Sequence, residues 1–146
     1  MLENFLDKLS KLYENKVILI TGATGGLAKE FIKNIKSNNT RFILLAKNKH
    51  KLNNLSEKNG NAEAYVCDFE KTSEIEKTIL KIKNKVNKID YIFNFAGYFS
   101  YLPINKISLR EYQKSFNINC YAPIFINSTF IQLMKKNNFG RIINIG

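Results

Sequence analysis

The stretch from Val17 to Ala28 reads VILITGATGGLA, in which the apolar run 17–21 predicts a strand and passes directly into a glycine-rich turn. Beyond the turn, apolar residues recur at helical spacing, at Leu27, Phe31 and Ile35. A strand, a turn and a helix in this order present backbone N–H groups and the positive end of a helix dipole to an anion. Gly22 can take the tight turn, and Gly25 or Gly26 can let the backbone approach a phosphate. The stretch therefore predicts a phosphate-binding turn, although a glycine-rich turn without a ligand has the same pattern.

Short apolar runs alternate with segments of helical period along the rest of the chain. The runs predict further strands at 42–46, 64–67, 91–95 and 142–145. A second helical stripe comprises Ile75, Ile79, Ile82 and Val86. Ser73 with Glu76 has the spacing of a capping box and predicts the start of this helix. Ser108 with Glu111 repeats the box before a long helix that reaches about residue 137 and is closed by Gly140. Such alternation predicts one α/β domain with five parallel strands.

Residues 1–15 precede the first strand and predict an amphipathic helix. Its apolar positions are Leu2, Phe5, Leu6, Leu9 and Leu12. We expect this helix to pack on the domain formed by residues 16–146, while a role at a membrane surface or a partner remains an alternative. No run approaches the ~20 apolar residues of a membrane span, and residues 1–15 do not resemble a secretory signal. The prediction is a cytoplasmic protein without a membrane partner.

The chain of 146 residues has a net charge of +11, which raises the question of nucleic acid. Its 20 Lys, 20 Asn and 19 Ile are spread over the whole sequence, as a general compositional bias would place them. No Arg-rich run with interleaved aromatic residues occurs, so a specific nucleic-acid partner is not expected. Cys67 and Cys120 stand apart and His50 is the one histidine, which argues against a metal site or a disulfide framework.

The end of the second predicted strand bears on the choice of nucleotide. NAD-selective sites place a carboxylate there to bind the ribose 2′-hydroxyl, but no Asp or Glu occurs between residues 31 and 56. Lys47 and Asn48 follow the strand instead, and a cation suits the 2′-phosphate of NADP. The sequence therefore favours NADP over NAD as the cofactor.

Several ordered motifs resemble those of the short-chain dehydrogenase/reductase family, in its single-domain branch. Thr21–Ala28 matches the Thr-Gly-x-x-x-Gly-x-Gly turn with Ala28 as its last small residue, and Asp68 follows the third strand as in the family. Asn94–Gly97 is similar to the Asn-Asn-Ala-Gly segment, with Phe95 in the second position. Residues 140–145 resemble the fifth strand of the family. The resemblance covers residues 16–146 and implies the cofactor-binding part of a Rossmann-type fold.

The long predicted helix contains Asn119, which aligns with a helix Asn of the family. Pro123 has no N–H, so the carbonyl of Asn119 loses its helical partner and can hold an ordered water. The resemblance implies that this water belongs to the proton relay of catalysis. A tolerated helix kink with a solvated carbonyl is the alternative.

The resemblance implies hydride transfer between NADP(H) and a small ketone or alcohol, in a full-length form that is a homo-oligomer. The cofactor-binding residues that we predict are Gly22, Thr24, Gly25, Gly26, Leu27, Lys47, Asn48, Asp68, Phe69, Asn94, Ala96 and Gly97. Asn119 is the one catalytic residue expected here, because no Tyr is followed four residues later by Lys. We expect the domain to be incomplete after the fifth strand and the chain to be inactive alone. A non-catalytic dinucleotide-binding or regulatory protein, and a basic nucleic-acid-binding protein, remain alternatives.

Overall fold

The computed structural model describes residues 2–35 and 39–145. In this part of the chain, five parallel strands form one sheet in the order β3-β2-β1-β4-β5. The strands are β1 (Val17–Thr21), β2 (Arg41–Ala46), β3 (Ala62–Val66), β4 (Tyr91–Asn94) and β5 (Arg141–Asn144). The helices are α1 (Leu2–Tyr13), α2 (Gly26–Asn34), α3 (Lys49–Lys58), α4 (Thr72–Lys83), α5 (Leu109–Phe116) and α6 (Ala122–Lys136). The predicted α/β class with a doubly wound parallel sheet is confirmed.

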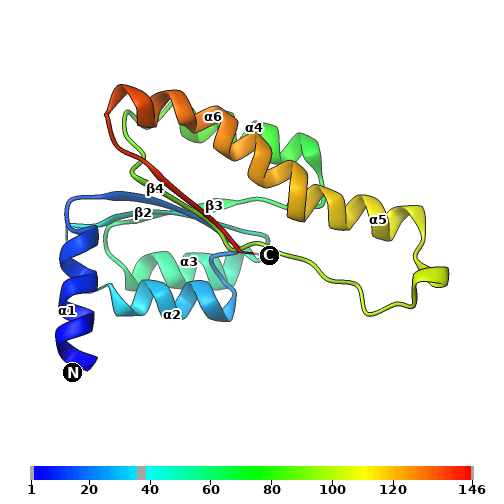
Figure 1. The fold of residues 1–146 in the computed structure, drawn as a ribbon, viewed down its shortest axis with the longest axis horizontal. Helices are drawn as coiled ribbons and strands as arrows, with labels where there is room; N and C mark the ends of the chain where they lie inside the picture. Colours follow the sequence, from blue (N-terminus) through cyan, green and yellow to red (C-terminus); the bar gives the residue numbers. More distant parts are fainter. Residues whose placement is uncertain (1, 36–38, 146) are drawn as a thin grey trace.

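Helices cover both faces of the sheet. Figure 1 shows α2 and α3 on one face and α4 and α6 on the other, with α1 at the end of the molecule near the start of the strands. The strand order reverses between β1 and β4, whose paired ends are Thr21 and Asn94. Because all strands are parallel, their carboxyl ends meet at one edge, where α/β sheets bind ligands.

The helix after the phosphate turn packs with a different stripe from the predicted one. The buried positions are Ala28, Ile32 and Ile35, whereas Leu27 is 57 % exposed and Phe31 is half-buried. The small side chain of Ala28, 1 % exposed, lets α2 lie close to the sheet. Leu27 of the predicted stripe is therefore exposed, while Ala28, predicted as the last small residue of the turn motif, makes the close contact.

The two edge strands differ from their predicted ranges. β3 begins at Ala62, two residues before the predicted start. Glu63 lies inside this strand and forms an ion pair with Arg41 on β2. The apolar pattern did not include Ala62 and Glu63, because a charged residue interrupts the run. β5 is also an edge strand, with Ile142 and Ile143 half-buried and Arg141 exposed. The expectation of strands covered on both faces therefore fails for the edges.

The two predicted capping boxes have different outcomes. Ser108 does cap α5, since its side chain accepts a hydrogen bond from the N–H of Glu111 at 3.2 Å. Ser73 does not cap α4, because the helix already begins at Thr72 and places Ser73 inside its first turn. Glu76 instead accepts a hydrogen bond from the hydroxyl of Tyr121. The position of the helix start, rather than the spacing, decides whether the serine caps the helix.

The long helix predicted before the fifth strand is present with an irregular centre. A π-helical segment, Asn117–Tyr121, joins α5 to α6, and Ala122 N–H donates to the carbonyl of Asn117. The helix ends at Lys136, and Asn138 takes the left-handed conformation with φ 52°. Gly140 does not end it. An added Cβ at Gly140 would lie 2.5 Å from Met134 Sδ, so this glycine permits close packing on α6.

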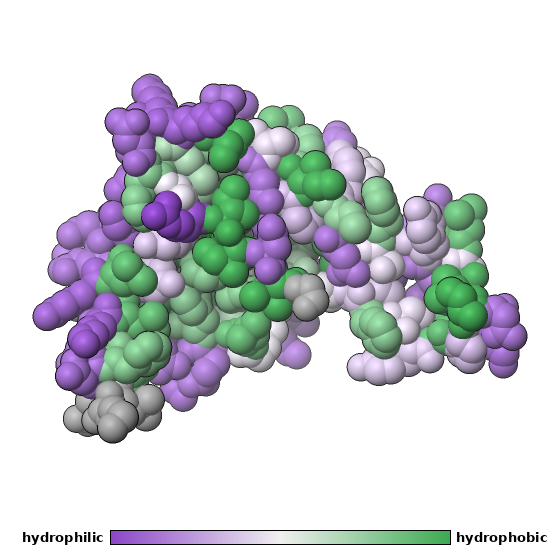
Figure 2. All heavy atoms as spheres, viewed as in Figure 1, coloured by the Kyte–Doolittle hydropathy of each residue, from purple (hydrophilic) through white to green (hydrophobic). Residues whose placement is uncertain are grey.

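An arm extends from the domain beyond β4. It comprises the loop 97–108, with a short 3₁₀ turn (Ile104–Lys106), and α5, and it protrudes in Figure 1. Figure 2 shows hydrophobic side chains on the surface of this arm. Those most exposed are Phe99, Tyr101, Leu102, Ile104, Leu109 and Tyr112.

Helix α1 lies where residues 1–15 predicted one. Leu9 packs partly against the core and Tyr13 is buried, whereas Phe5 and Leu12 are exposed. The Tyr13 ring meets the Tyr91 ring edge-on with centroids 4.9 Å apart. The side chain of Leu2 lies outside the described residues. In the part of the chain that the structure describes, no helix has the length and apolar character to cross a membrane.

Candidate functional site

The turn after β1 is pressed against the end of β4. Gly22 has φ +62°, and a Cβ added there would lie 2.7 Å from the backbone N of Ala96. Thr21 Oγ1 accepts a hydrogen bond from that same N–H at 3.1 Å. A left-handed conformation and a backbone approach this close both require glycine. The two central strands therefore end in a joined pair of turns at the point where the strand order reverses.

The start of α2 is open above these turns. Gly25 is the N-cap residue, its N–H donates to the carbonyl of Gly22 at 2.8 Å, and no side chain caps the helix. A Cβ added at Gly26 would meet nothing within 4 Å. The first turn of α2 carries no acidic residue, and Thr24 is half-buried beside it. Free backbone N–H groups and the helix dipole make this end suited to an anion.

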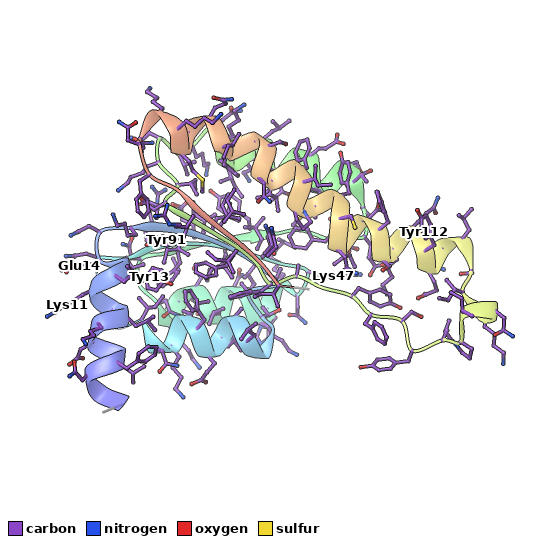
Figure 3. The ribbon with its side chains drawn as sticks, in the orientation of Figure 1. Lys11, Tyr13, Glu14, Lys47, Tyr91 and Tyr112 are labelled. Atoms are coloured by element: carbon purple, nitrogen blue, oxygen red, sulfur yellow. The ribbon has the colours of Figure 1, made fainter. Side chains whose placement is uncertain are left out.

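The end of β2 carries the cation predicted for a 2′-phosphate. Lys47 is exposed, and its Nζ lies 3.1 Å from Asp68 Oδ2 and 3.1 Å from Glu70 Oε1. Hydrogen bonds that the Lys47 ammonium donates to Asp68 and then to Glu70 raise its pKa. Asn48 caps α3, with its Oδ1 accepting from the N–H of Lys51 at 2.9 Å. Figure 3 shows Lys47 at the carboxyl edge of the sheet, far from Tyr13 and Tyr91 at the other end.

Asp68 lies after β3 and faces the same edge. Burial opposes its ionisation, but the Glu70 N–H, which donates to Oδ1 at 3.1 Å, and the Lys47 ammonium outweigh burial and lower the Asp68 pKa. Asp68 is therefore a carboxylate at neutral pH. Phe69 is 7 % exposed and its side chain belongs to the core, so only its backbone could contact a cofactor.

Three asparagines meet where β4 ends. Asn94 Nδ2 donates to Asn127 Oδ1 of α6 at 3.1 Å and to Asn144 Oδ1 of β5 at 2.8 Å. Asn94 is 1 % exposed, and its Oδ1 has no hydrogen-bond partner among the described residues. The sequence identified Asn94 but missed Asn127 and Asn144 as its partners. The signal that could have identified Asn127 and Asn144 is that each is a polar residue in an otherwise apolar segment.

Phe95 replaces the second Asn of the family motif, and its surroundings are aromatic. Its ring lies 5.3 Å from the Phe93 ring and 5.9 Å from the Phe31 ring, measured between centroids. The side chain thus packs on the face covered by α2. An aromatic residue at this position fits its neighbours, although it contributes no hydrogen bond.

Asn119 lies in the π-helical segment and holds the chain just after Gly97. Its Nδ2 donates to the carbonyl of Tyr98 at 2.7 Å, and its Oδ1 accepts from the N–H of Tyr98 at 2.9 Å. The prediction concerned its main-chain carbonyl, and the side-chain contact was missed. The π-helical hydrogen bond at Ala122 occurs beside Pro123, which has no N–H to continue the α-helical pattern.

The aromatic residues beyond Gly97 are divided between packing and exposure. The Tyr98 hydroxyl donates to Glu111 Oε2 at 2.5 Å, and Lys114 Nζ lies 3.9 Å from its ring centroid. Phe99 and Tyr101 are 73 % and 93 % exposed. Tyr98 thus contacts residues of α5, whereas Phe99 and Tyr101 contact each other edge-on, with ring centroids 5.2 Å apart.

The predicted cofactor residues gather along one edge, at the carboxyl ends of four adjacent strands. This arrangement offers a helix N-terminus for phosphate, a cation at β2 and a carboxylate at β3. In the described part of the chain, no group of three or more His, Cys, Asp or Glu residues could hold a metal ion.

The family model described as short chain dehydrogenase matches residues 16–146. The chain belongs to the short-chain dehydrogenase family. Residues that carried the resemblance, from the turn at Gly22 to Asn144, all fall inside the matched range.

Relatives of this short-chain dehydrogenase chain include a diacetyl reductase [(S)-acetoin forming] of Staphylococcus epidermidis, 31 % identical over 135 residues, which cover 89 % of this chain and 52 % of the reductase. Estradiol 17-beta-dehydrogenase 11 of Mus musculus is 26 % identical, with 97 % of this chain and 49 % of the relative covered. The chain thus spans about half the length of these curated relatives.

Solved short-chain dehydrogenase structures share the fold. A metagenomic short-chain oxidoreductase in complex with NADP has a TM-score of 0.82 at 23 % identity, covering 92 % of this chain and 63 % of the other. NAD⁺-bound xylitol dehydrogenase has a TM-score of 0.75 at 27 % identity, covering 90 % and 53 %. Neighbours of this fold therefore bind either nicotinamide dinucleotide.

Proposed function

We propose that this chain is the dinucleotide-binding part of an NADP(H)-dependent oxidoreductase that transfers hydride between the cofactor and a ketone or alcohol. The observation that carries the proposal is the approach of Gly22 to Ala96, which leaves the start of α2 open at the sheet edge. Bulkier residues would close this cradle, so the chain fits a bound pyrophosphate. The diacetyl reductase among the relatives supports a carbonyl substrate.

The proposed roles follow the order of the strands. The turn of Gly22, Thr24, Gly25, Gly26 and Leu27 binds the pyrophosphate through backbone N–H groups. Lys47 and Asn48 bind the 2′-phosphate, and Asp68 with the backbone of Phe69 binds the adenine end. Asn94, Ala96 and Gly97 flank the nicotinamide half. The cofactor, when bound, supplies or accepts the hydride.

The preference for NADP rests on the charges at the end of β2. Lys47 is exposed there, and residues 31–56 contain no carboxylate to bind a ribose 2′-hydroxyl. Asp68 and Glu70 compensate part of the Lys47 charge, so a 2′-phosphate has to draw the ammonium away from them. The proposed preference for NADP over NAD therefore depends on the charge of Lys47, and reversing that charge tests it.

Catalysis by the whole protein is a further part of the proposal. Asn119 contributes through a water on its main-chain carbonyl, and the Ser, Tyr and Lys of the family come from residues outside this sequence. The 146-residue chain alone is then inactive. We also propose a helix over 1–15 joined to a cofactor domain over 16–146, a homo-oligomeric full-length form and a cytoplasmic location.

The test is calorimetric titration of the full-length protein with NADPH and with NADH, followed by assay of diacetyl reduction. Tighter binding of NADPH with reduction of a carbonyl compound supports the proposal. Binding without turnover of a panel of ketones would favour the non-catalytic alternative. Absence of binding to both dinucleotides overturns the proposed site.

A further inference from the structure

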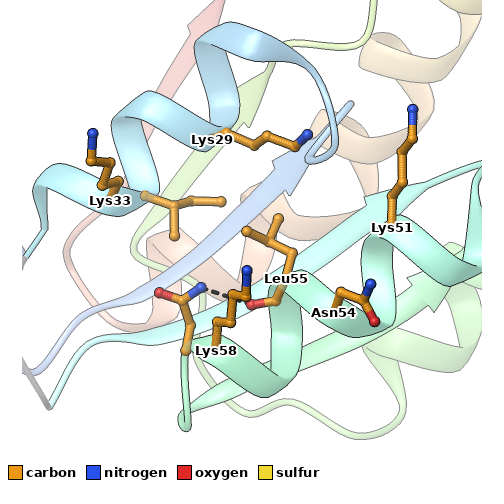
Figure 4. A pocket seen from close by; sticks show the side chains of 8 residues that line it. Lys29, Lys33, Lys51, Asn54, Leu55 and Lys58 are labelled. Atoms are coloured by element: carbon orange, nitrogen blue, oxygen red, sulfur yellow. Dashed lines mark hydrogen bonds between the residues drawn. The ribbon is translucent and has the colours of Figure 1, made fainter.

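A hollow of about 540 Å³ lies between α2 and α3. Its lining comprises Lys29, Ile32, Lys33, Lys51, Asn54, Leu55, Lys58 and Asn59. Figure 4 shows the lysines of the two helices on either side of Leu55. None of the residues assigned to the cofactor lines the hollow, although the N–H groups of Lys29 and Lys51 bond to Gly25 and Asn48.

The charge of the hollow is concentrated and largely uncompensated. Four of its eight lining residues are Lys and none is acidic, whereas Lys makes up 20 of the 146 residues of the chain. Among the described residues, Lys29, Lys51 and Lys58 form no ion pair, and Lys33 has one exposed contact with Glu30 at 3.7 Å. An anion between the helices is attracted by lysines of both.

The floor of the hollow is apolar and its remaining polar groups are amides. Ile32 is buried and Leu55 half-buried. Asn59 Nδ2 already donates to the carbonyl of Leu55 at 2.7 Å, and Asn54 lies 3.3 Å from a ring nitrogen of His50. The apolar floor supports the lysine stems while the ammonium groups reach solvent. The volume matches that of sites for small ligands.

We propose that this hollow binds a small multivalent phosphate anion, held by Lys29 and Lys33 of α2 and by Lys51 and Lys58 of α3. Ammonium groups bind phosphate as point charges and accept varied geometry, which suits four flexible side chains around an open site. A soluble polyphosphate and the headgroup of an anionic phospholipid share this chemistry. The site is independent of the proposed dehydrogenase activity.

The test is calorimetric titration of the full-length protein with inorganic tripolyphosphate at physiological salt, with sedimentation of phosphatidylcholine vesicles with and without phosphatidic acid as the second arm. We compare the double variant Lys33→Gln/Lys58→Gln with the control Lys77→Gln/Lys83→Gln, which removes equal charge from exposed positions on α4. The Lys33→Gln/Lys58→Gln variant should bind the phosphate probe about tenfold or more weakly than the wild type, and the control less than about twofold more weakly. Lys29→Gln/Lys51→Gln should repeat the loss.

Loss confined to the hollow variants supports the proposal, and the arm in which it occurs identifies the source of the phosphate. Equal losses in the hollow and control variants would assign binding to diffuse charge and overturn it. Absence of wild-type binding in both arms would also overturn it. Thermal melts of each variant confirm that the fold is retained, and NADPH titration separates this outcome from failure of the cofactor site.

Discussion

The side-chain amide of Asn119 binds both backbone polar groups of Tyr98, donating to its carbonyl at 2.7 Å and accepting from its N–H at 2.9 Å. This pair fixes the chain as it leaves the end of β4, since Ser115 Oγ in turn accepts from Asn119 Nδ2 at 3.2 Å. The helix residue predicted for a proton relay thus also positions the turn beside the cofactor edge.

Replacement of Asn119 by Ala should loosen the backbone after Gly97. Loss of two hydrogen bonds removes protection of the Tyr98 amide, and we expect its hydrogen exchange to accelerate about tenfold or more. The measurement is hydrogen exchange read by mass spectrometry. Cys120→Ser is the matched control, because Cys120 is the next, exposed residue of the same segment. Equal exchange in both variants would contradict the positioning role.

Gly22→Ala should destabilise the fold by about 2 kcal/mol or more. The change forces a Cβ into a left-handed position and toward the backbone of Ala96. Gly26→Ala, where nothing lies within 4 Å, should change the free energy of unfolding by less than about 1 kcal/mol. Urea denaturation compares the two. Similar losses would show that the approach of the turns does not constrain the fold.

Charge reversal at Lys47 should separate the two dinucleotides. Lys47→Glu is expected to weaken NADPH binding about tenfold or more while changing NADH binding less than about threefold, because only NADPH carries the 2′-phosphate. Lys49→Glu, an exposed lysine at the start of α3, is the control. Calorimetry measures the affinities of the wild type and of both variants for NADPH and for NADH. Parallel losses for NADPH and NADH would refute the role of Lys47.

The carboxylate of Asp68 should stabilise the fold in a pH-dependent way. Its pKa is lowered in the folded state, so its contribution is present above the unfolded value of 3.8 and is lost as pH falls through the folded pKa. We expect Asp68→Asn to cost about 1 kcal/mol at pH 7 and to cost less at each step below pH 4. Urea denaturation across pH measures this. A difference that stays constant with pH would exclude the charge as its cause.

The two cysteines should react with thiol reagents at very different rates. Burial raises the pKa of Cys67 to about 11, whereas Cys120 is exposed. At pH 8 we expect rapid labelling at Cys120 and slow labelling at Cys67, limited by opening of the fold. Mass spectrometry of iodoacetamide adducts counts the sites. Cys120→Ser should abolish the rapid phase, and rapid labelling of Cys67 would contradict the burial.

The alternation of apolar runs and helical stripes was sufficient to predict the fold. The first strand, Val17–Thr21, was predicted with its observed limits, because a buried central strand has an uninterrupted apolar sequence. The limits of the edge strands were harder to predict, because Glu63 inside β3 pairs with Arg41 and interrupts the apolar pattern. The predicted stripe of α2 was wrong at Leu27, which is exposed, whereas Ala28 of the predicted turn motif is buried.

The candidate site was predictable where backbone geometry dictates the residue, as at Gly22. It was less so where side chains meet from distant segments. Asn127 and Asn144 contact Asn94 from positions 33 and 50 residues away. Asp90 is 1 % exposed and accepts the N–H of Val17 at 2.8 Å, a contact across 73 residues. Composition and local spacing do not predict such pairs, because these contacts depend on the strand order.

The strand order has a consequence for folding during synthesis. β2 and β3 can join β1 soon after they are made, but the other edge of β1 pairs with Tyr91–Asn94, so it waits for that segment. During this interval the most hydrophobic strand of the sheet offers its backbone groups to any extended neighbour. Pairing with β4 ends this exposure, so its duration follows the time needed to translate residues 22–94.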